Sequence, residues 1–298
     1  MEYGAHLPLL EPLDQRRAER AWDIANLTSY ARAARDLGFR ALASNDHLAY
    51  DGPWLDGIVA LASVLEASGD LTLATTVSLP VVRGPAALAK AAAALDILSG
   101  GRLMLGVGPG SSRADYALAA VEFEQRWPRF ETAVRELRAH LGGSPYGATQ
   151  VLEPRPTRPG GPSIWIGSWG SPAGLRRVAR LGDGWLASAY NTTPDQVASG
   201  WREHGLSCAV ATMWTYVTDG AAERAAWLAR LAGLLRSAPG DLAGRVLVGS
   251  PESCAALLRE YADAGTDLLF VWPLADHSRQ LGRVMRDVVP LVDPAAAG

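Results

Sequence analysis

The sequence has 298 residues, of which 48% are hydrophobic and 20% are charged, and its formal net charge is −3. This composition is typical of a globular protein with a sizeable core. The charge gives no reason to expect a nucleic-acid partner, because such proteins carry clustered basic surfaces. The sequence contains no run of about 18 apolar residues, so we expect no membrane span.

Two cysteines, Cys208 and Cys254, lie far apart and match neither a Cys-x-x-Cys pair nor a metal-binding spacing. They are most simply reduced, buried thiols, as in the cytosol. The first residues lack the charged and apolar regions of a secretory signal. We therefore expect a cytoplasmic protein.

Eight short segments that are apolar or rich in β-branched residues predict strands. They lie near residues 5, 42, 74, 105, 165, 186, 213 and 269. Helices are predicted from apolar residues at helical spacing or from runs of strong helix formers. The predicted helices cover 24–37, 58–67, 86–98, 115–141, 172–181, 221–236, 251–264 and 279–289.

Proline and glycine punctuate this pattern. We expect Pro128 to break the helical segment 115–141, and the Pro- and Gly-rich segment 144–162 to be irregular. The segments 144–162 and 190–206 are candidates for mobile lids.

Strands that alternate with helices predict an α/β protein with a parallel sheet. Eight such units in a chain of this length match a closed (β/α)8 TIM barrel with irregular loop insertions better than a doubly wound sheet. We expect one domain over 1–298.

Active sites of such barrels lie at the carboxyl ends of the strands. The residues expected there are small, hydroxylated or aromatic, with one titratable pair. They are His6, Asp46, His47, Thr76, Val77, Gly108, Gly110, Ser111, Ser112, Gly167, Ser168, Trp169, Gly170, Ser171, Tyr190, Asn191, Trp214, Tyr216 and Trp272. Polar loops occur at this end of any barrel, but clustering over several strand ends favours a site.

The sequence gives little support for metal-dependent catalysis or for a serine hydrolase. At most two of the five histidines lie at predicted strand ends, so we expect no metal site. A Gly-x-Ser-x-Gly elbow is missing, which argues against a serine hydrolase.

The glycine-rich stretch 106–110 is open to two interpretations: a dinucleotide-binding turn, or a barrel loop beside a cofactor. Its Gly-x-Gly-x-Gly spacing resembles part of a dinucleotide fingerprint, but a third glycine at the proper place and a suitable acidic residue are missing. The turn 167–171, with Pro172 opening the next helix, suits a phosphate at a helix N-terminus. Together the two loops suggest a phosphorylated cofactor across the barrel mouth.

Five segments spread over nearly the whole chain form a set: 45–48, 95–110, 123–127, 181–185 and 248–252. Together they resemble the signature of the luciferase-like monooxygenase family. The resemblance implies a (β/α)8 barrel, commonly a homodimer. It also implies a cofactor, either reduced FMN for oxygen-dependent monooxygenation or the deazaflavin coenzyme F420 for hydride transfer.

The resemblance also implies roles for single residues. It implies that His47, with Asp46, is the proton-transfer pair. It also implies that Thr76-Val77 is a bulge of the third strand behind the flavin ring, where the family often has a non-proline cis peptide. Gly108, Gly110, Ser111 and Ser112 then lie beside the cofactor. Gly167, Ser168, Trp169, Gly170 and Ser171 then form its phosphate turn.

One position departs from the family pattern. Ser111 stands where the F420-dependent sugar-phosphate dehydrogenases of the family carry a catalytic glutamate. Sugar-phosphate oxidation is therefore not expected.

We predict an oxidoreductase that uses F420, or alternatively FMN, on a small organic substrate. A histidine exchanges a proton near neutral pH, as His47 would in this role, although it could instead be a structural residue bonded to Asp46. His6, Trp54, Trp214, Tyr216 and Trp272 are candidates for the substrate pocket, or else core aromatics. A non-catalytic flavin-binding barrel is a further alternative.

Overall fold

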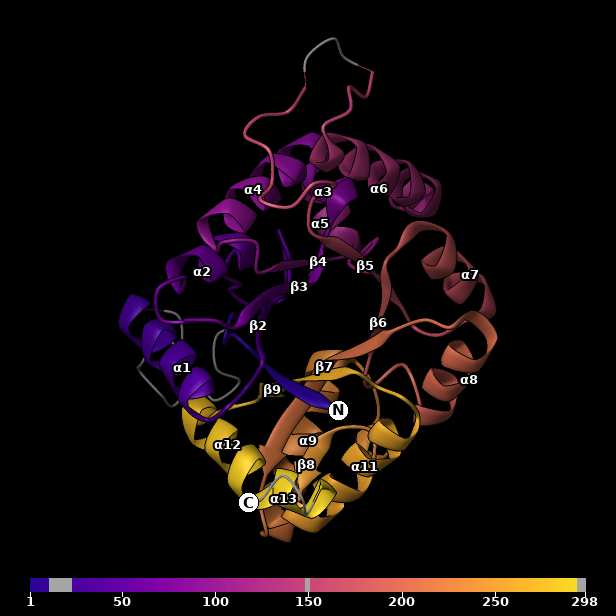
Figure 1. Ribbon diagram of the computed structural model, residues 1–298. Helices are drawn as coiled ribbons and strands as arrows, with labels where there is room; N and C mark the ends of the chain where they lie inside the picture. Colours follow the sequence, from indigo (N-terminus) through magenta and orange to yellow (C-terminus); the bar gives the residue numbers. More distant parts are fainter. Residues whose placement is uncertain (11–22, 148–150, 294–298) are drawn as a thin grey trace.

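The computed structural model describes residues 1–10, 23–147 and 151–293. A ring of strands is surrounded by helices (Figure 1). The strands of the ring are β1 (Glu2–His6), β2 (Ala41–Ser44), β3 (Thr72–Ser78), β4 (Leu103–Val107), β5 (Ser163–Ser168), β6 (Gly184–Ser188), β7 (Cys208–Val217) and β9 (Leu268–Pro273). All neighbours pair in parallel, and β6–β7 and β9–β1 pairings close the ring. The predicted eight-stranded (β/α)8 barrel is confirmed.

A ninth strand, β8 (Leu247–Gly249), was not predicted from the sequence. It pairs in parallel with the carboxyl end of β7, from Thr215 to Val217, outside the ring. β7 is ten residues long and has a register shift against β9 between Val210 and Met213. The barrel therefore carries a two-stranded extension at the end of β7.

The helices are assigned from the backbone. They are α1 (Ile24–Asp36), α2 (Gly57–Ser63), α3 (Pro80–Arg83), α4 (Pro85–Leu98), α5 (Arg113–Leu118), α6 (Arg126–Gly142), α7 (Pro172–Leu181), α8 (Pro194–His204), α9 (Ala221–Leu235), α10 (Pro239–Leu242), α11 (Pro251–Asp263), α12 (His277–Arg283) and α13 (Val289–Val292), with short turns η1 (Phe123–Gln125) and η2 (Val284–Val288). None of those in the described ranges is long and apolar enough to cross a membrane.

The expected break at Pro128 needs correction. The segment 115–141 is interrupted before Pro128, between the end of α5 and η1, and Pro128 lies in the first turn of α6. A proline is tolerated there because the first N–H groups of a helix have no intrahelical partner. The segment 190–206 is mostly α8, which begins with a capping box of Thr193 and Gln196. The segment 144–162 is irregular where it is described, as predicted.

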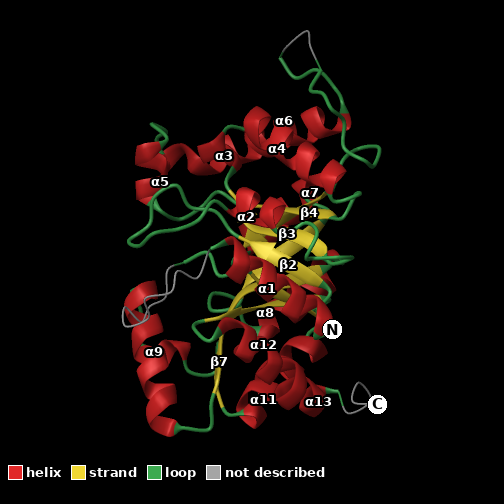
Figure 2. Cartoon of the chain, turned by 90° about the vertical axis from the view of Figure 1, so that its left-hand side faces the viewer, coloured by secondary structure: helices red, strands yellow, loops and turns green. Residues whose placement is uncertain are grey.

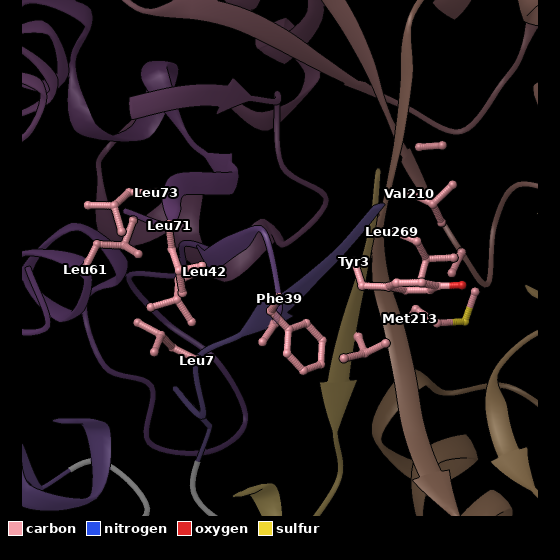
Figure 3. Close-up of a cluster of buried hydrophobic side chains, with 14 of the residues drawn as sticks. Tyr3, Leu7, Phe39, Leu42, Leu61, Leu71, Leu73, Val210, Met213 and Leu269 are labelled. Atoms are coloured by element: carbon pink, nitrogen blue, oxygen red, sulfur yellow. The ribbon is translucent and has the colours of Figure 1, made fainter. Parts of the chain in front are cut away.

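Alternation along the strands produces two cores. Outward residues such as Leu42 and Leu73 pack with Leu61 of α2, as Figure 3 shows. Inward residues are mostly small and fill the barrel: Ala41, Ala43, Ala74, Met104, Leu186, Ala209, Ala211 and Phe270. Phe270 covers Gly4, where a Cβ would lie 2.3 Å from its ring. The same alternation turns His6 and Trp272, two residues further along, toward the carboxyl end of the barrel interior.

Candidate active site at the carboxyl ends of the strands

His47 lies in the connection from β2 to α2, and its partner is Asp115 of α5. Nδ1 of His47 lies 2.8 Å from Oδ2 of Asp115. The Asp115 side chain is 1% exposed, and its Oδ1 accepts the backbone N–H groups of Leu48 and Ala49, both at 2.8 Å. Because an ionised carboxylate only accepts, Nδ1 of His47 carries the proton, and Nε2 is left for a ligand.

The structure places Asp46 in a different network. Its buried carboxylate accepts Nε of Arg83 at 2.5 Å and Nη2 at 2.7 Å, and also the N–H of Leu79 at 3.2 Å. Arg83 also bonds the carboxylate of Asp56, the N-cap of α2. The hydrogen bonds that Arg83 donates to Asp46 and then to Asp56 hold its pKa above its ordinary value. His47 and Asp46 thus bond different partners, so the alternative of a structural His47 bonded to Asp46 is not what the structure shows.

Four of the five predicted pocket residues meet in one chain of ring contacts with His47. His6 stacks on Trp272 at 3.6 Å between centroids, and Trp272 stacks on Trp214 at 4.1 Å. Trp54 contacts Trp272 edge-on at 5.8 Å and His47 at 4.6 Å. We call these five residues the aromatic arc, and it spans the ends of the adjacent strands β7, β9 and β1 together with the loop after β2.

Tyr216 lies two residues further along β7, away from this chain of contacts. Its ring packs at 4.6 Å on Trp227 of α9, and its hydroxyl lies 3.0 Å from Oε1 of Glu223 and 3.2 Å from Oδ2 of Asp276. Burial raises the pKa of Tyr216 to about 12. Tyr216 thus belongs to the apolar cluster under α9, which also includes Trp214 and Trp272.

His6 is a neutral hydrogen-bonding group inside the mouth. It is fully buried, and Nδ1 lies 2.7 Å from the carbonyl oxygen of Leu7. Burial lowers its pKa to about 3, so Nδ1 donates and Nε2 is an acceptor. Three buried ring nitrogens here have no hydrogen-bond partner within the part of the chain that the structure describes. They are Nε2 of His6, Nε1 of Trp54 and Nε1 of Trp214. Unpaired buried polar atoms are candidates for contacts with a bound ligand.

The opposite side of the mouth, from β3 to β5, has a glycine at the end of two strands, Gly108 after β4 and Gly167 in β5. The Thr76-Val77 peptide is cis, as the resemblance implied, at a register shift between Thr75 and Ser78. Val77 packs against two glycines: a Cβ would lie 2.8 Å from it at Gly108 and 3.1 Å from it at Gly167. We call Val77, Gly108 and Gly167 the glycine arc. Larger residues do not fit at the two glycines unless Val77 moves.

The loop after β4 connects this arc to Asp115. Gly110 has a φ of 74°, a conformation that favours glycine. Ser112 caps α5, and its hydroxyl accepts the N–H of Asp115 at 3.4 Å. Ser111 is exposed beside it. The predicted cofactor loop thus positions the carboxylate that holds His47.

The turn after β5 leads into α7. The hydroxyl of Ser171, the N-cap, accepts the N–H of Gly174 at 3.2 Å, and that of Ser168 accepts the N–H of Gly170 at 3.4 Å. A Cβ at Gly174 would lie 2.3 Å from Oγ of Ser168, so the backbone approaches the turn closely. Trp169 is 57% exposed. Hydroxyls and free N–H groups at a helix N-terminus suit a phosphate.

The described residues hold no cluster of three or more His, Cys, Asp or Glu side chains suited to a metal ion. Cys208 and Cys254 are both buried and unpaired as thiols, and burial raises the pKa of Cys254 to about 12.

Fold and mouth together define the class of protein: an enzyme on a (β/α)8 barrel, with its site at the carboxyl ends of the strands. A family model described as luciferase-like monooxygenase matches residues 1–239, and the chain belongs to this family. The family inferred from the five segments is thereby confirmed.

Comparison with curated proteins finds F420-dependent dehydrogenases. The F420-dependent glucose-6-phosphate dehydrogenase of Amycolatopsis mediterranei (strain U-32) is 26% identical over 89% of this chain and 93% of its own length. The F420-dependent hydroxymycolic acid dehydrogenase of Mycobacterium tuberculosis is 31% identical over 55% of this chain, and that match spans 49% of the relative. These relatives identify the chain as an oxidoreductase.

Solved structures share the fold. Monooxygenase RslO1 from Streptomyces bottropensis aligns over 100% of both chains, with a TM-score of 0.80 and 20% identity. An F420-dependent secondary alcohol dehydrogenase aligns over 98% of both chains, with a TM-score of 0.79 and 15% identity.

Proposed function

We propose that this protein transfers hydride between coenzyme F420 and a small, largely apolar organic alcohol or its carbonyl form. The observation that carries the proposal is the His47–Asp115 pair, whose free Nε2 lies among the aromatic arc at the mouth of the barrel. The names of the curated relatives support F420 as the cofactor.

The residues at the mouth fit such a cofactor. The glycine arc offers the side chain of Val77 and two strand ends without side chains to a flat ring, and the turn 168–171 with the N-terminus of α7 offers N–H groups and hydroxyls to its phosphate. When bound, F420 accepts or supplies the hydride. Gly110 and Ser112 contribute by shaping the loop between these groups.

His47 is the proposed general acid and base. Its Nε2 accepts the hydroxyl proton of an alcohol as the hydride leaves, and returns it in the reverse direction. Asp115 holds the ring in the tautomer this needs and stabilises its protonated form. A direct part for Asp46 in proton transfer stays a prediction; its contact with Arg83 supports a role in holding the loop.

The substrate side of the proposal rests on the aromatic arc. Trp54, Trp214 and Trp272 offer apolar faces, while Nε2 of His6 offers one acceptor. Ser111 replaces the acid that the family's sugar-phosphate dehydrogenases carry. An apolar alcohol is therefore favoured over a sugar phosphate.

The proposal is tested by incubating the protein with F420 and a panel of alcohols without oxygen and following loss of the cofactor's visible absorbance. We expect His47→Ala to lower turnover by about 10²-fold or more, because a positioned acid–base group contributes that much. Binding of F420, followed by fluorescence, should be retained. Unchanged turnover would remove His47 from the mechanism, whereas F420 binding without turnover of any alcohol by the wild type would favour a non-catalytic barrel.

Reduced FMN with oxygen is the second candidate, because the structural neighbours include monooxygenases. Parallel titrations with F420 and reduced FMN discriminate the two. Tight binding of reduced FMN alone, with oxygen consumption in the presence of substrate, would replace our proposal by a monooxygenase.

The homodimer and the cytoplasmic location stay predictions from the sequence. Light scattering on the purified protein tests the first, and fractionation of cells that produce the protein tests the second.

A further inference from the structure

A basic groove of about 550 Å³ lies on the outer face of α7. It is lined by Ala173, Arg176, Arg177, Ala179, Arg180 and His204. It begins in the first turn of α7, directly after the proposed phosphate turn, and follows the helix for about 10 Å at 1.5 Å per residue. The neighbouring helix α8, beside α7 in Figure 1, contributes His204 at its end.

The groove has more positive than negative charge. Arg177 and Arg180 both bond Glu131 of α6, at 3.0 and 2.7 Å, and Arg135 of α6 lies 3.5 Å from it, so three guanidinium groups share one carboxylate. The hydrogen bond from Arg180, followed by that from Arg177, holds the pKa of Glu131 below its ordinary value. Arg176 is exposed and makes no ion pair with the described residues. Ala173 and Ala179 are small and leave room between the cations.

Two of the three arginines, Arg177 and Arg180, are held in place by the fold. Arg177 lies over the ring of Trp127 at 4.4 Å, in addition to its bond to Glu131. Restrained guanidinium groups bind carboxylates with less loss of side-chain freedom, and their fork matches two carboxylate oxygens. A row of such groups next to a phosphate site suits a ligand with several carboxylates.

We infer that this groove binds the oligoglutamate tail by which F420 differs from FMN. In F420, a lactyl group and a chain of glutamates follow the phosphate, whereas FMN ends at the phosphate. A phosphate at the turn 168–171 places the next groups of F420 at the start of the groove. This inference rests on the proposed function, and it goes further by assigning a binding site to the part of the cofactor that lies outside the barrel mouth.

The test compares binding, by fluorescence titration, of F420 with several glutamates and F420 without any. We expect the wild type to prefer the tailed form by about tenfold, a preference that decreases with added salt. Arg176→Glu and the double variant Arg176→Glu/Arg180→Glu should remove most of this preference and leave the Kd of the tailless form unchanged. Arg32→Glu, the same charge change on an exposed position of α1, is the control and should keep the preference.

The outcomes separate the two proposals. Equal affinity of the wild type for both forms, or a preference that survives both variants, overturns the groove as the tail site while F420 binding itself stands. If neither form of F420 binds, the proposed function fails and the inference fails with it.

Discussion

His47 and Asp115 show how much of this site depends on one long-range pair. Asp115 accepts three hydrogen bonds, two from the backbone at 48–49 and one from the histidine. The carboxylate therefore fixes the loop and the ring together. A substitution of the Asp115 carboxylate therefore tests proton transfer by His47 separately from cofactor binding.

Asp115→Asn is expected to lower turnover by about 10²-fold while the Kd of F420 stays the same. If the amide oxygen keeps the bonds to Leu48 and Ala49, the NH₂ group faces Nδ1 of His47. The ring must then carry its proton on Nε2, which can no longer accept. Steady-state kinetics and the pH profile of turnover measure this.

Asp183→Asn is a matched control, because that carboxylate bonds the backbone N–H of Ile164 at 2.7 Å near the amino end of β5. It should leave turnover and its pH profile unchanged. A purely structural role for Asp115 would lower stability without altering the pH profile.

His6 makes stability depend on pH in a predictable direction. Its pKa is about 3 in the folded protein and 6.5 in the ordinary reference state, so between these values only the unfolded chain binds the proton. Stability from this group is complete above about pH 6.5 and falls by about 1.4 kcal/mol per pH unit below it. His6→Phe, which keeps a ring against Trp272, should show a shallower fall between pH 6 and 4 in urea unfolding. Parallel curves for the two proteins would disprove the assignment.

At the scale of elements, β3, β4 and β5 meet at the glycine arc. Val77 fills the space in front of Gly108 and Gly167, so the shape of this side depends on contacts between three strands. The short helix α3 supports the same region, since Arg83 connects Asp46 after β2 to the N-cap of α2.

Gly108→Ala should destabilise the protein by about 1–3 kcal/mol, because the new methyl would lie 2.8 Å from Val77. It should also weaken F420 binding, since Val77 must move within the proposed ring site. Adding Val77→Ala should restore most of the stability, measured by urea unfolding. No recovery in the double variant would mean that the strain lies elsewhere in the loop.

At the scale of the molecule, the chain closes one barrel and places its candidate site at one end. Figure 2 shows α5 and α9 on the side opposite the amino terminus, so the helix that holds Asp115 and the one that packs on Tyr216 lie on the same side of the barrel. A ligand bound there contacts elements from most of the sequence.

Such a ligand should stabilise the whole fold. F420 at 100 times its Kd should add about 2.7 kcal/mol to the free energy of unfolding, seen as a rise in Tm of several degrees. FMN at the same concentration should add less. A larger effect of FMN would favour the alternative cofactor.

The sequence predicted the barrel because its strands are short apolar runs separated by well-marked helices. β8 was missed because three residues carry no periodicity. The strand-end rule found His47 and three other members of the aromatic arc, His6, Trp214 and Trp272, but not Asp115, which lies 68 residues away in a helix and has no local signal. The pairing of Asp46 with Arg83 was equally invisible, since adjacency in sequence suggested His47 instead.

The division of the mouth into a glycine arc and an aromatic arc bears on how the protein can change. Under the proposed function, substitutions on β7, β9 and β1 should alter which substrate is held, and those on β3, β4 and β5 should alter how the cofactor is held. Variation on one side need not disturb the other, because different strands carry the two arcs. A library confined to Trp54, Trp214 and Trp272 should therefore yield new specificities on an unchanged redox centre.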